Sequence, residues 1–316
     1  MRVDEALVLD DRVRFGVRVN GLSRTSALDE IRQAEALAYD SLWVTDHLAF
    51  HVPVTDAMGL LAFAAGVTER IMLGTAVYLL PLRPTIATAK AAASVDMLSG
   101  GRLTLGVGVG GEYAPEWEAA GVDRRTRGAR ADEAIPLLRR LWSEKRVGHE
   151  GQHERFPELS VAPGPARDGG PPVWVGGRSD AAMRRAGRLG DGYISHMATP
   201  EHYARNLERI ADAASEAGRA PLPFSTSAYF FTWIGDDDEQ AAAACADELS
   251  RVYAMPFEGR VRKYCLVGTP DTIRVRLQQY VDAGLRHPII APLRDEAATI
   301  ERFADEVRPY VGVAGA

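Results

Sequence analysis

The chain has few cysteines and few lysines. Its 316 residues include two cysteines, Cys245 and Cys265, too few for the disulfide framework of a small secreted domain. No C-x-x-C motif or histidine cluster indicates a metal site. The lysines are Lys90, Lys145 and Lys263, and none of them ends a strand-like segment. A Schiff-base aldolase or isomerase, which needs such a lysine, is therefore disfavoured.

Long apolar runs and an excess of positive charge are also missing. The longest apolar stretches, such as residues 60–67, are far shorter than the roughly 20 residues of a membrane span. Residues 1–5 lack the apolar core of a signal peptide. The net charge is −6, from 37 basic and 43 acidic residues, with no long basic run to attract nucleic acid. We expect a reduced, cytoplasmic protein that binds neither nucleic acid nor a membrane.

What the sequence does contain is a regular alternation of strand-like and helical patterns. Strand patterns cover residues 13–19, 41–45, 71–78, 102–109, 172–175, 192–196, 224–234 and 288–292. Helical patterns cover residues 26–38, with Ser26 as the expected N-cap, and 56–67, 84–97, 131–145, 180–189, 200–217, 239–253, 270–283 and 296–311. Such alternation implies parallel strands with helices outside, and eight units favour a closed (β/α)8 TIM barrel over an open sheet.

The alternation is interrupted in two places. Residues 146–171 hold several Gly and Pro residues and a predicted hairpin around residues 151–152, and residues 254–268 are irregular. We interpret both as loop insertions in a single α/β domain spanning residues 1–316, because the alternation resumes after each. These two loops are the parts expected to determine the substrate, and neither carries a recognisable signature.

A glycine-rich turn invites a dinucleotide-binding interpretation. Gly106, Gly108 and Gly111 fit G-x-G-x-x-G, and Asp132 follows about twenty residues later. However, the turn comes after the fourth strand, and no strand follows within the roughly thirty residues of a βαβ unit. A Rossmann site is therefore disfavoured. The glycines either let a flat ligand approach the backbone or form a tightly packed strand exit.

Proton-carrying side chains stand at the ends of predicted strands. Asp46 and His47 follow the buried run 41–44, which is the position of catalytic groups in α/β barrels. Histidine titrates near neutrality and suits general acid–base work. An ordinary surface loop also accounts for this dipeptide. His196 ends the sixth strand and either lines the same rim or packs in the core.

The segment from Gly176 to Ser179 precedes a predicted helix and has the features of a phosphate site. Free amides at a helix start point towards an anion, and Gly177 permits close approach. The Ser179 hydroxyl can donate to the phosphate and Arg178 can add charge. A plain helix N-cap is the alternative.

Several segments together resemble the bacterial luciferase-like superfamily of flavin- and deazaflavin-dependent oxidoreductases. The similar segments are residues 41–48, 73–77 with 82–85, 100–112, 127–133, and 172–179 with 186–192. The resemblance is strong over about residues 13–200 and loose beyond them. It implies a (β/α)8 barrel, in agreement with the count of strands. It also implies a homodimer that binds a small-molecule substrate and a flavin-type cofactor.

In this superfamily the ring of FMN or of the deazaflavin coenzyme F-420 lies across the C-terminal mouth of the barrel. The resemblance implies a non-prolyl cis peptide at Ala76-Val77 that presses on the ring, whereas an ordinary trans strand end is the plain alternative. It also implies ring contacts at Gly108 and Gly110 and phosphate contacts at residues 176–179. His47, Asp46 and Glu112 would flank the reactive face, with Asp46 orienting His47 or touching the cofactor. Glu112 would donate a proton if its site is dry enough.

The resemblance leaves the cofactor open and favours F-420. The run 45–47 and a Glu directly after the glycine turn resemble deazaflavin-dependent members, whereas residues 176–179 also resemble FMN-dependent ones. The deazaflavin supports hydride transfer alone and predicts a dehydrogenase or reductase. Reduced FMN adds dioxygen and predicts a monooxygenase served by a separate flavin reductase. A non-catalytic flavin-binding protein is the alternative from another class.

Overall fold

In the computed structural model, which describes residues 3–313, parallel strands close into an eight-stranded barrel. The order around the barrel is β2–β3–β4–β6–β9–β10–β12–β14, and β14 pairs again with β2. The strands are β2 Gly16–Arg18, β3 Ser41–Val44, β4 Met72–Thr75, β6 Leu103–Gly108, β9 Val173–Gly176, β10 Gly192–His196, β12 Ser225–Ile234 and β14 His287–Pro292. Each overlaps a predicted strand, so the predicted barrel is confirmed.

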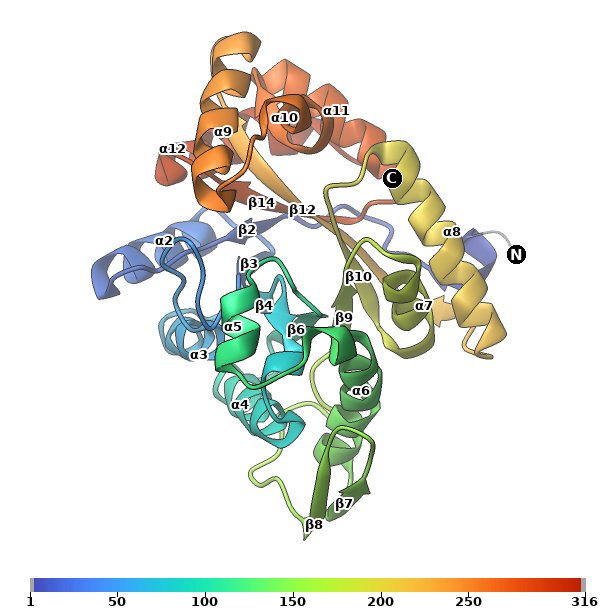
Figure 1. The fold of residues 1–316 in the computed structure, drawn as a ribbon. Coiled ribbons are helices and arrows are strands. Elements are labelled where there is room, and N and C mark those ends of the chain that lie inside the picture. The colour runs from blue at the N-terminus through green and yellow to red at the C-terminus, as the bar shows by residue number, and fades with distance from the viewer. Residues whose placement is uncertain (1–2, 314–316) are drawn as a thin grey trace.

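Helices follow the strands and surround the barrel (Figure 1). They are α2 Arg24–Ala36, α3 Ala57–Val67, α4 Thr85–Leu98, α6 Arg127–Ser143, α7 Asp180–Leu189, α8 Pro200–Glu216, α9 Asp238–Tyr253, α11 Pro270–Asp282 and α12 Glu296–Arg302. The last predicted helix is not continuous, because α12 passes into a π turn at Phe303–Val307 and a 3-10 turn at Arg308–Tyr310. Among residues 3–313, no helix is both long and apolar enough to cross a bilayer.

Helix α2 begins earlier than its apolar pattern predicts. Ser23, rather than Ser26, is the N-cap. The Ser23 hydroxyl accepts the Ser26 N–H at 3.1 Å, and the Ser26 hydroxyl accepts the Ser23 N–H at 3.0 Å. This reciprocal capping box satisfies two amides that the helix leaves unpaired, which is why the helix extends to Arg24.

Several short elements have no counterpart in the predicted pattern. They are α1 Val3–Ala6, β1 Leu7–Val8, the 3-10 turns Leu80–Leu82 and Arg124–Thr126, α5 Ala114–Ala119, β11 Leu222–Pro223, α10 Glu258–Tyr264 and β13 Leu266–Gly268. The predicted strand 71–78 is divided into β4 and the short β5 Tyr78–Leu79. Two of the elements without a predicted counterpart are important for the site. Helix α5 follows the glycine turn after β6, and α10 follows α9 in the second insertion.

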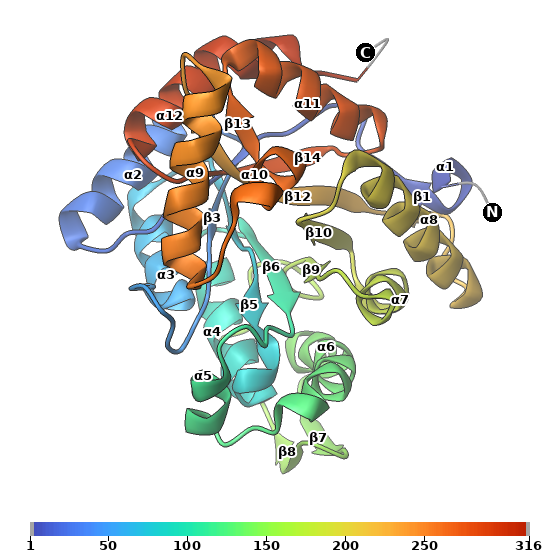
Figure 2. The ribbon, with the colours of Figure 1, turned by 45° about the horizontal axis from the view of Figure 1, so that its top comes forward.

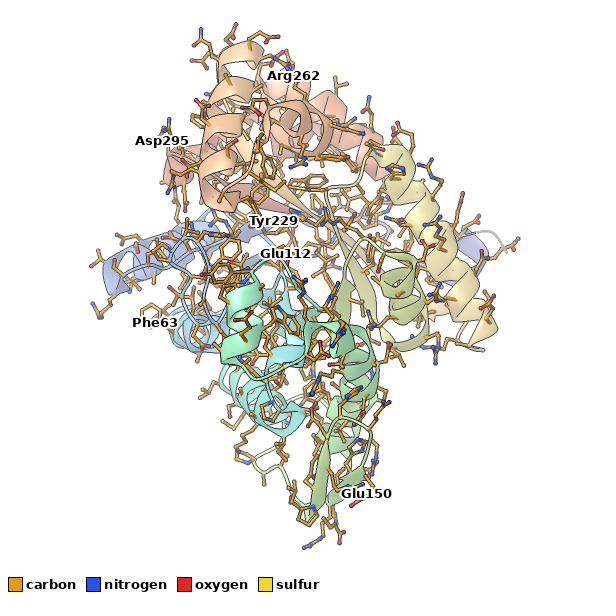
Figure 3. The ribbon with its side chains drawn as sticks, viewed as in Figure 1. Phe63, Glu112, Glu150, Tyr229, Arg262 and Asp295 are labelled. Carbon is orange, nitrogen blue, oxygen red and sulfur yellow. The ribbon has the colours of Figure 1, made fainter. Side chains whose placement is uncertain are left out.

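The two insertions lie in different places. Residues 146–171 form the predicted hairpin, β7 Val147–Glu150 and β8 Arg155–Leu159, outside the helical ring (Figure 1). Glu133 on α6 accepts the N–H of Glu154, whose carboxylate in turn accepts the N–H of Thr85 at the start of α4. Figure 3 labels Glu150, the last residue of β7, in the lower part of the view. The expectation that this insertion determines the substrate stays a prediction.

The second insertion packs on the aromatic side chains of the barrel. Phe257 and Val261, at α10, belong to one apolar cluster with Trp174 of β9 and Phe231 of β12. Helices α9 and α10 contact each other and β13 (Figure 2). Residues 254–268 thus cover the barrel, as expected of a loop that shapes a binding site.

Polar groups in the barrel interior are tied into one hydrogen-bonded chain. Trp43 Nε1 donates to the Ser41 hydroxyl at 2.7 Å, and this hydroxyl lies 2.6 Å from His287 Nε2. The hydroxyl can accept two hydrogen bonds and donate one, so it serves both rings, and burial keeps His287 neutral. Burial, with a smaller contribution from Arg14, lowers the pKa of His287 to about 3.

This buried histidine should make the fold sensitive to acid. The folded-state pKa lies below the unfolded value of about 6.5, so between these values only the unfolded chain takes up the proton. Stability from His287 is complete above about pH 6.5 and falls as the pH drops, by about 2 kcal/mol at pH 5. Urea unfolding at pH 7 and pH 5 checks this. His287→Gln should lose that part of the pH dependence, whereas the exposed control His202→Gln should keep it. Equal pH dependence in the two variants contradicts the prediction.

Candidate active site

The imidazole of His47, just beyond the end of β3, is held by a carboxylate from another part of the chain. Nδ1 of His47 lies 3.2 Å from both carboxylate oxygens of Glu116, and the Leu48 N–H donates to Oε2 at 3.2 Å. Glu116, on α5, is fully buried, whereas the His47 side chain is 17% exposed. The geometry places the Nδ1 proton against Glu116 and leaves Nε2 as the ring nitrogen free to take up or release a proton.

Asp46 faces a different set of partners. Its carboxylate, fully buried, accepts two hydrogen bonds from Arg83 at 2.7 and 2.8 Å and one from the Leu79 N–H at 2.9 Å. The guanidinium of Arg83 also lies over the ring of Tyr78, 4.4 Å from its centroid. Asp46 therefore fixes the segment that follows β4, while the orienting of His47 is done by Glu116.

The segment after β4 contains the cis peptide expected at Ala76-Val77. Val77 is half-buried, and its methyl groups lie where two glycines leave room. A methyl group on Gly108 would come within 2.3 Å of Val77 Cγ2, and one on Gly176 within 2.5 Å of Cγ1. Gly108 and Gly176 thus make room for the Val77 side chain. If these two glycines affect cofactor binding, they do so by determining where Val77 lies.

The glycine turn after β6 leads to α5. Gly110 and Gly111 have φ values of +53° and +120°, which other residues seldom adopt, so the turn depends on them. Glu112 follows with its side chain exposed to solvent. Figure 3 labels Glu112 and Tyr229 near the centre of the view. The dry surroundings required for Glu112 to act as a proton donor are absent in this structure, and the buried acid of this segment is Glu116.

The N-terminus of α7 is exposed to solvent, together with the guanidinium of Arg178. Gly177 has φ +150°, and a methyl group there would lie 2.6 Å from the Ala182 side chain. Ser179 is the N-cap, accepting the Ala182 N–H at 3.3 Å, and Arg178 is exposed beside it. The plain N-cap is therefore present, and it leaves an exposed helix start next to a guanidinium.

Residue types alone gave no sign of Glu116 or Arg83 as site residues. Glu116 lies 69 positions from His47 and sits on a helix of six residues, too short to show periodicity. Arg83 lies 37 positions from Asp46. It belongs to residues 82–85, one of the segments that resemble the luciferase-like superfamily, and this resemblance was the one sign that Arg83 belongs to the site. His196 packs between Tyr229 and Phe231, and burial lowers its pKa to about 4.

Comparison with known families and curated proteins agrees with this architecture. A profile described as luciferase-like monooxygenase matches residues 12–287. An F420-dependent glucose-6-phosphate dehydrogenase of Kineococcus radiotolerans is 29% identical over 88% of this chain and 90% of its own length. An F420-dependent hydroxymycolic acid dehydrogenase of Mycobacterium tuberculosis is 32% identical over 87% of this chain and 81% of its own.

Solved structures share the fold at lower identity. An F420-dependent secondary alcohol dehydrogenase superposes with a TM-score of 0.84 at 19% identity, covering 94% of this chain and 98% of the other. The oxygenating constituent of an FMN-bound 3,6-diketocamphane monooxygenase from Pseudomonas putida superposes at 0.73 and 19% identity, covering 95% and 98%. The chain therefore belongs to the luciferase-like monooxygenase family and is a flavin- or deazaflavin-type oxidoreductase of that family.

Proposed function

We propose that this enzyme transfers hydride between a small organic substrate and the deazaflavin coenzyme F-420. The observation that carries the proposal is the His47–Glu116 pair, in which a fully buried carboxylate holds Nδ1 and leaves Nε2 free for one proton. A dehydrogenase or reductase needs one such group, because each hydride that leaves a carbinol carbon or adds to a carbonyl carbon is accompanied by one proton exchanged at the oxygen. The F420-dependent dehydrogenases that are 29% and 32% identical support the same cofactor.

The residues present fit a cofactor of this kind. Val77, seated between Gly108 and Gly176, offers an apolar surface to a flat ring. Gly177 and Ser179 leave the N-terminus of α7 accessible to a ligand, and Arg178 adds a positive charge beside it. These are features that favour binding of a phosphate-bearing cofactor tail. When bound, the deazaflavin would accept or give the hydride at ring carbon 5.

The protein side of the reaction rests on three groups. In the direction of alcohol oxidation, His47 Nε2 takes the hydroxyl proton, and in the reverse direction it returns that proton. Glu116 positions the imidazole and stabilises the charge that His47 gains. Asp46, through Arg83 and Leu79, holds the Val77 segment in place beside it.

Parallel binding titrations with coenzyme F-420 and with FMN, followed by fluorescence, test the proposal. We expect micromolar binding of F-420 and at least tenfold weaker binding of FMN. Arg178→Ala should weaken F-420 binding about threefold to tenfold, because one charge-assisted hydrogen bond to phosphate is lost. The exposed control Arg125→Ala should bind as the parent chain does. Tight binding of FMN alone would instead indicate a monooxygenase, and binding of neither would contradict the proposal.

A further inference from the structure

Aromatic side chains from distant parts of the chain form a continuous arc. We define the aromatic arc as Phe50, Tyr113, His196, Tyr229, Phe231 and Tyr253. Ring centroids along it are 5.6 Å apart for His196 and Phe231, and 6.0 Å for Phe231 and Tyr253. They are also 6.0 Å apart for Tyr253 and Phe50. The edge-to-face geometry of these pairs is favourable for aromatic packing.

Two rings of the aromatic arc, Tyr229 and Phe231, lie across the barrel from the segment that carries Val77, whereas Phe50 and Tyr113 follow β3 and β6, the strands on either side of β4. In the closed strand order, β12 is four positions from β4, and β10 is four positions from β3. Tyr229 and Phe231 of β12 therefore stand on the side opposite Val77. The ring of Phe50 stacks on the imidazole of His47 at 4.1 Å, so the arc begins at the proton-handling group.

Phe50, Tyr113 and Tyr253 retain part of their surface exposed to solvent. Such half-buried rings can still gain contact area when a ligand packs on them. Tyr229 and Phe231 are each 8% exposed and form the base of the same surface. The arc thus combines rigid buried rings with rings that are still available for contact.

The titratable side chains of the aromatic arc are uncharged at pH 7. His196 is neutral at pH 7 because burial lowers its pKa to about 4, and burial raises the pKa of Tyr229 to about 12. Arg18, the cation beside Tyr229, is engaged by the Pro292 carbonyl and by Glu296 at 3.3 Å. Arg18 Nε is buried without a hydrogen-bond partner, but the charge of Arg18 is paired with Glu296. Arg178 also acts electrostatically on His196 and Tyr253, and in the proposed function its charge faces the cofactor phosphate. A substrate carboxylate would therefore be buried beside cations whose charge is already taken up by other groups.

We propose that the substrate is an uncharged alcohol, or the carbonyl compound made from it, with an apolar ring-sized body that packs on the aromatic arc. This rests on the proposed function. The carbinol carbon gives up its hydrogen as hydride to the cofactor, the hydroxyl proton passes to His47 Nε2, and the C=O bond forms. The stacking of Phe50 on His47 places the apolar surface next to the group that receives the proton.

Three alcohols test the proposal with the cofactor-loaded enzyme. They are 1-phenylethanol, its para-carboxylate analogue 4-(1-hydroxyethyl)benzoate, and propan-2-ol, which lacks the ring. We expect kcat/KM for 1-phenylethanol to exceed both of the others at least tenfold, since burying a phenyl group favours binding and burying a carboxylate opposes it. Equal or better use of the carboxylate, or no gain from the ring, overturns the proposal.

Variants locate the effect on the arc. Tyr253→Ala should lower kcat/KM for 1-phenylethanol about fivefold to tenfold and leave that for propan-2-ol within twofold. Tyr253→Leu preserves apolar packing at the end of α9 and should lose about threefold. Tyr264→Ala, a half-buried tyrosine outside the arc, is the matched control. An equal loss for both alcohols in the two Tyr253 variants would contradict the assignment.

A binding measurement separates this proposal from the choice of cofactor. Calorimetric titration of acetophenone and 4-acetylbenzoate is carried out on the protein loaded with F-420 and on the protein loaded with FMN. Tighter binding of the neutral ketone in either form supports the aromatic arc as the substrate surface, even where F-420 binding fails. Tighter binding of the carboxylate overturns it, even where F-420 binds well.

Discussion

His47→Ala is expected to lower kcat/KM about 10²- to 10⁴-fold and to leave the dissociation constant of the cofactor within about twofold. The large loss follows because the proposed proton carrier is removed, and general acid–base catalysis contributes this much. Cofactor affinity should survive because the proposed phosphate-binding side of the site, at the start of α7, lies on another strand–helix unit. Steady-state kinetics with 1-phenylethanol and a fluorescence titration measure the two quantities separately.

The matched control is His202→Ala, which removes an exposed histidine from α8. Its kcat/KM should equal that of the parent chain. Glu116→Gln supplies a second measurement on the same pair, because an amide offers one acceptor oxygen where the carboxylate uses two. We expect kcat to fall about tenfold to a hundredfold with KM changed less than twofold, which is the pattern of a positioning residue. Unchanged turnover in His47→Ala would remove this pair from the mechanism.

The sequence predicted which segments form the site, because the strands and helices that position them show in the local hydrophobic pattern. Asp46 and His47 were found from their place after a buried run, and the glycine turn and Gly176–Ser179 segment from their place at strand ends. Such positions follow from counting strands and helices, since catalytic groups gather at one end of a barrel. The closed eight-stranded barrel agrees with that counting.

The partners of these residues could not be found in the same way. Which carboxylate orients His47 depends on the path of the chain after Gly111, and three acidic side chains, Glu112, Glu116 and Glu118, lie within that short stretch. Burial separates them, because Glu116 is 0% exposed and Glu112 faces solvent. Likewise, nothing in the sequence shows that Gly108 and Gly176 make room for Val77, since that contact joins three strand ends. Long-range packing, not local preference, decides these roles.

Arg83→Met is expected to destabilise the folded protein by about 3–5 kcal/mol, because it leaves the buried carboxylate of Asp46 without its cation. The Leu79 N–H alone cannot replace two charge-assisted hydrogen bonds at 2.7 and 2.8 Å. Methionine keeps much of the side-chain volume over Tyr78, so the loss reports charge rather than packing. Denaturant unfolding at pH 7, with the slope compared between variants, measures the change.

The double variant Asp46→Asn/Arg83→Met distinguishes an unpaired charge from general damage. Removing the carboxylate should recover at least half of the lost stability, since a neutral amide can stay buried with the Leu79 N–H as its donor. Arg125→Met, which breaks the exposed ion pair with Asp123, should have little effect. If the double variant is as unstable as Arg83→Met, the cost lies in packing and Asp46 is not the reason for it. If it recovers stability but not turnover, Asp46 is required in its charged, paired form to hold the Val77 segment beside His47.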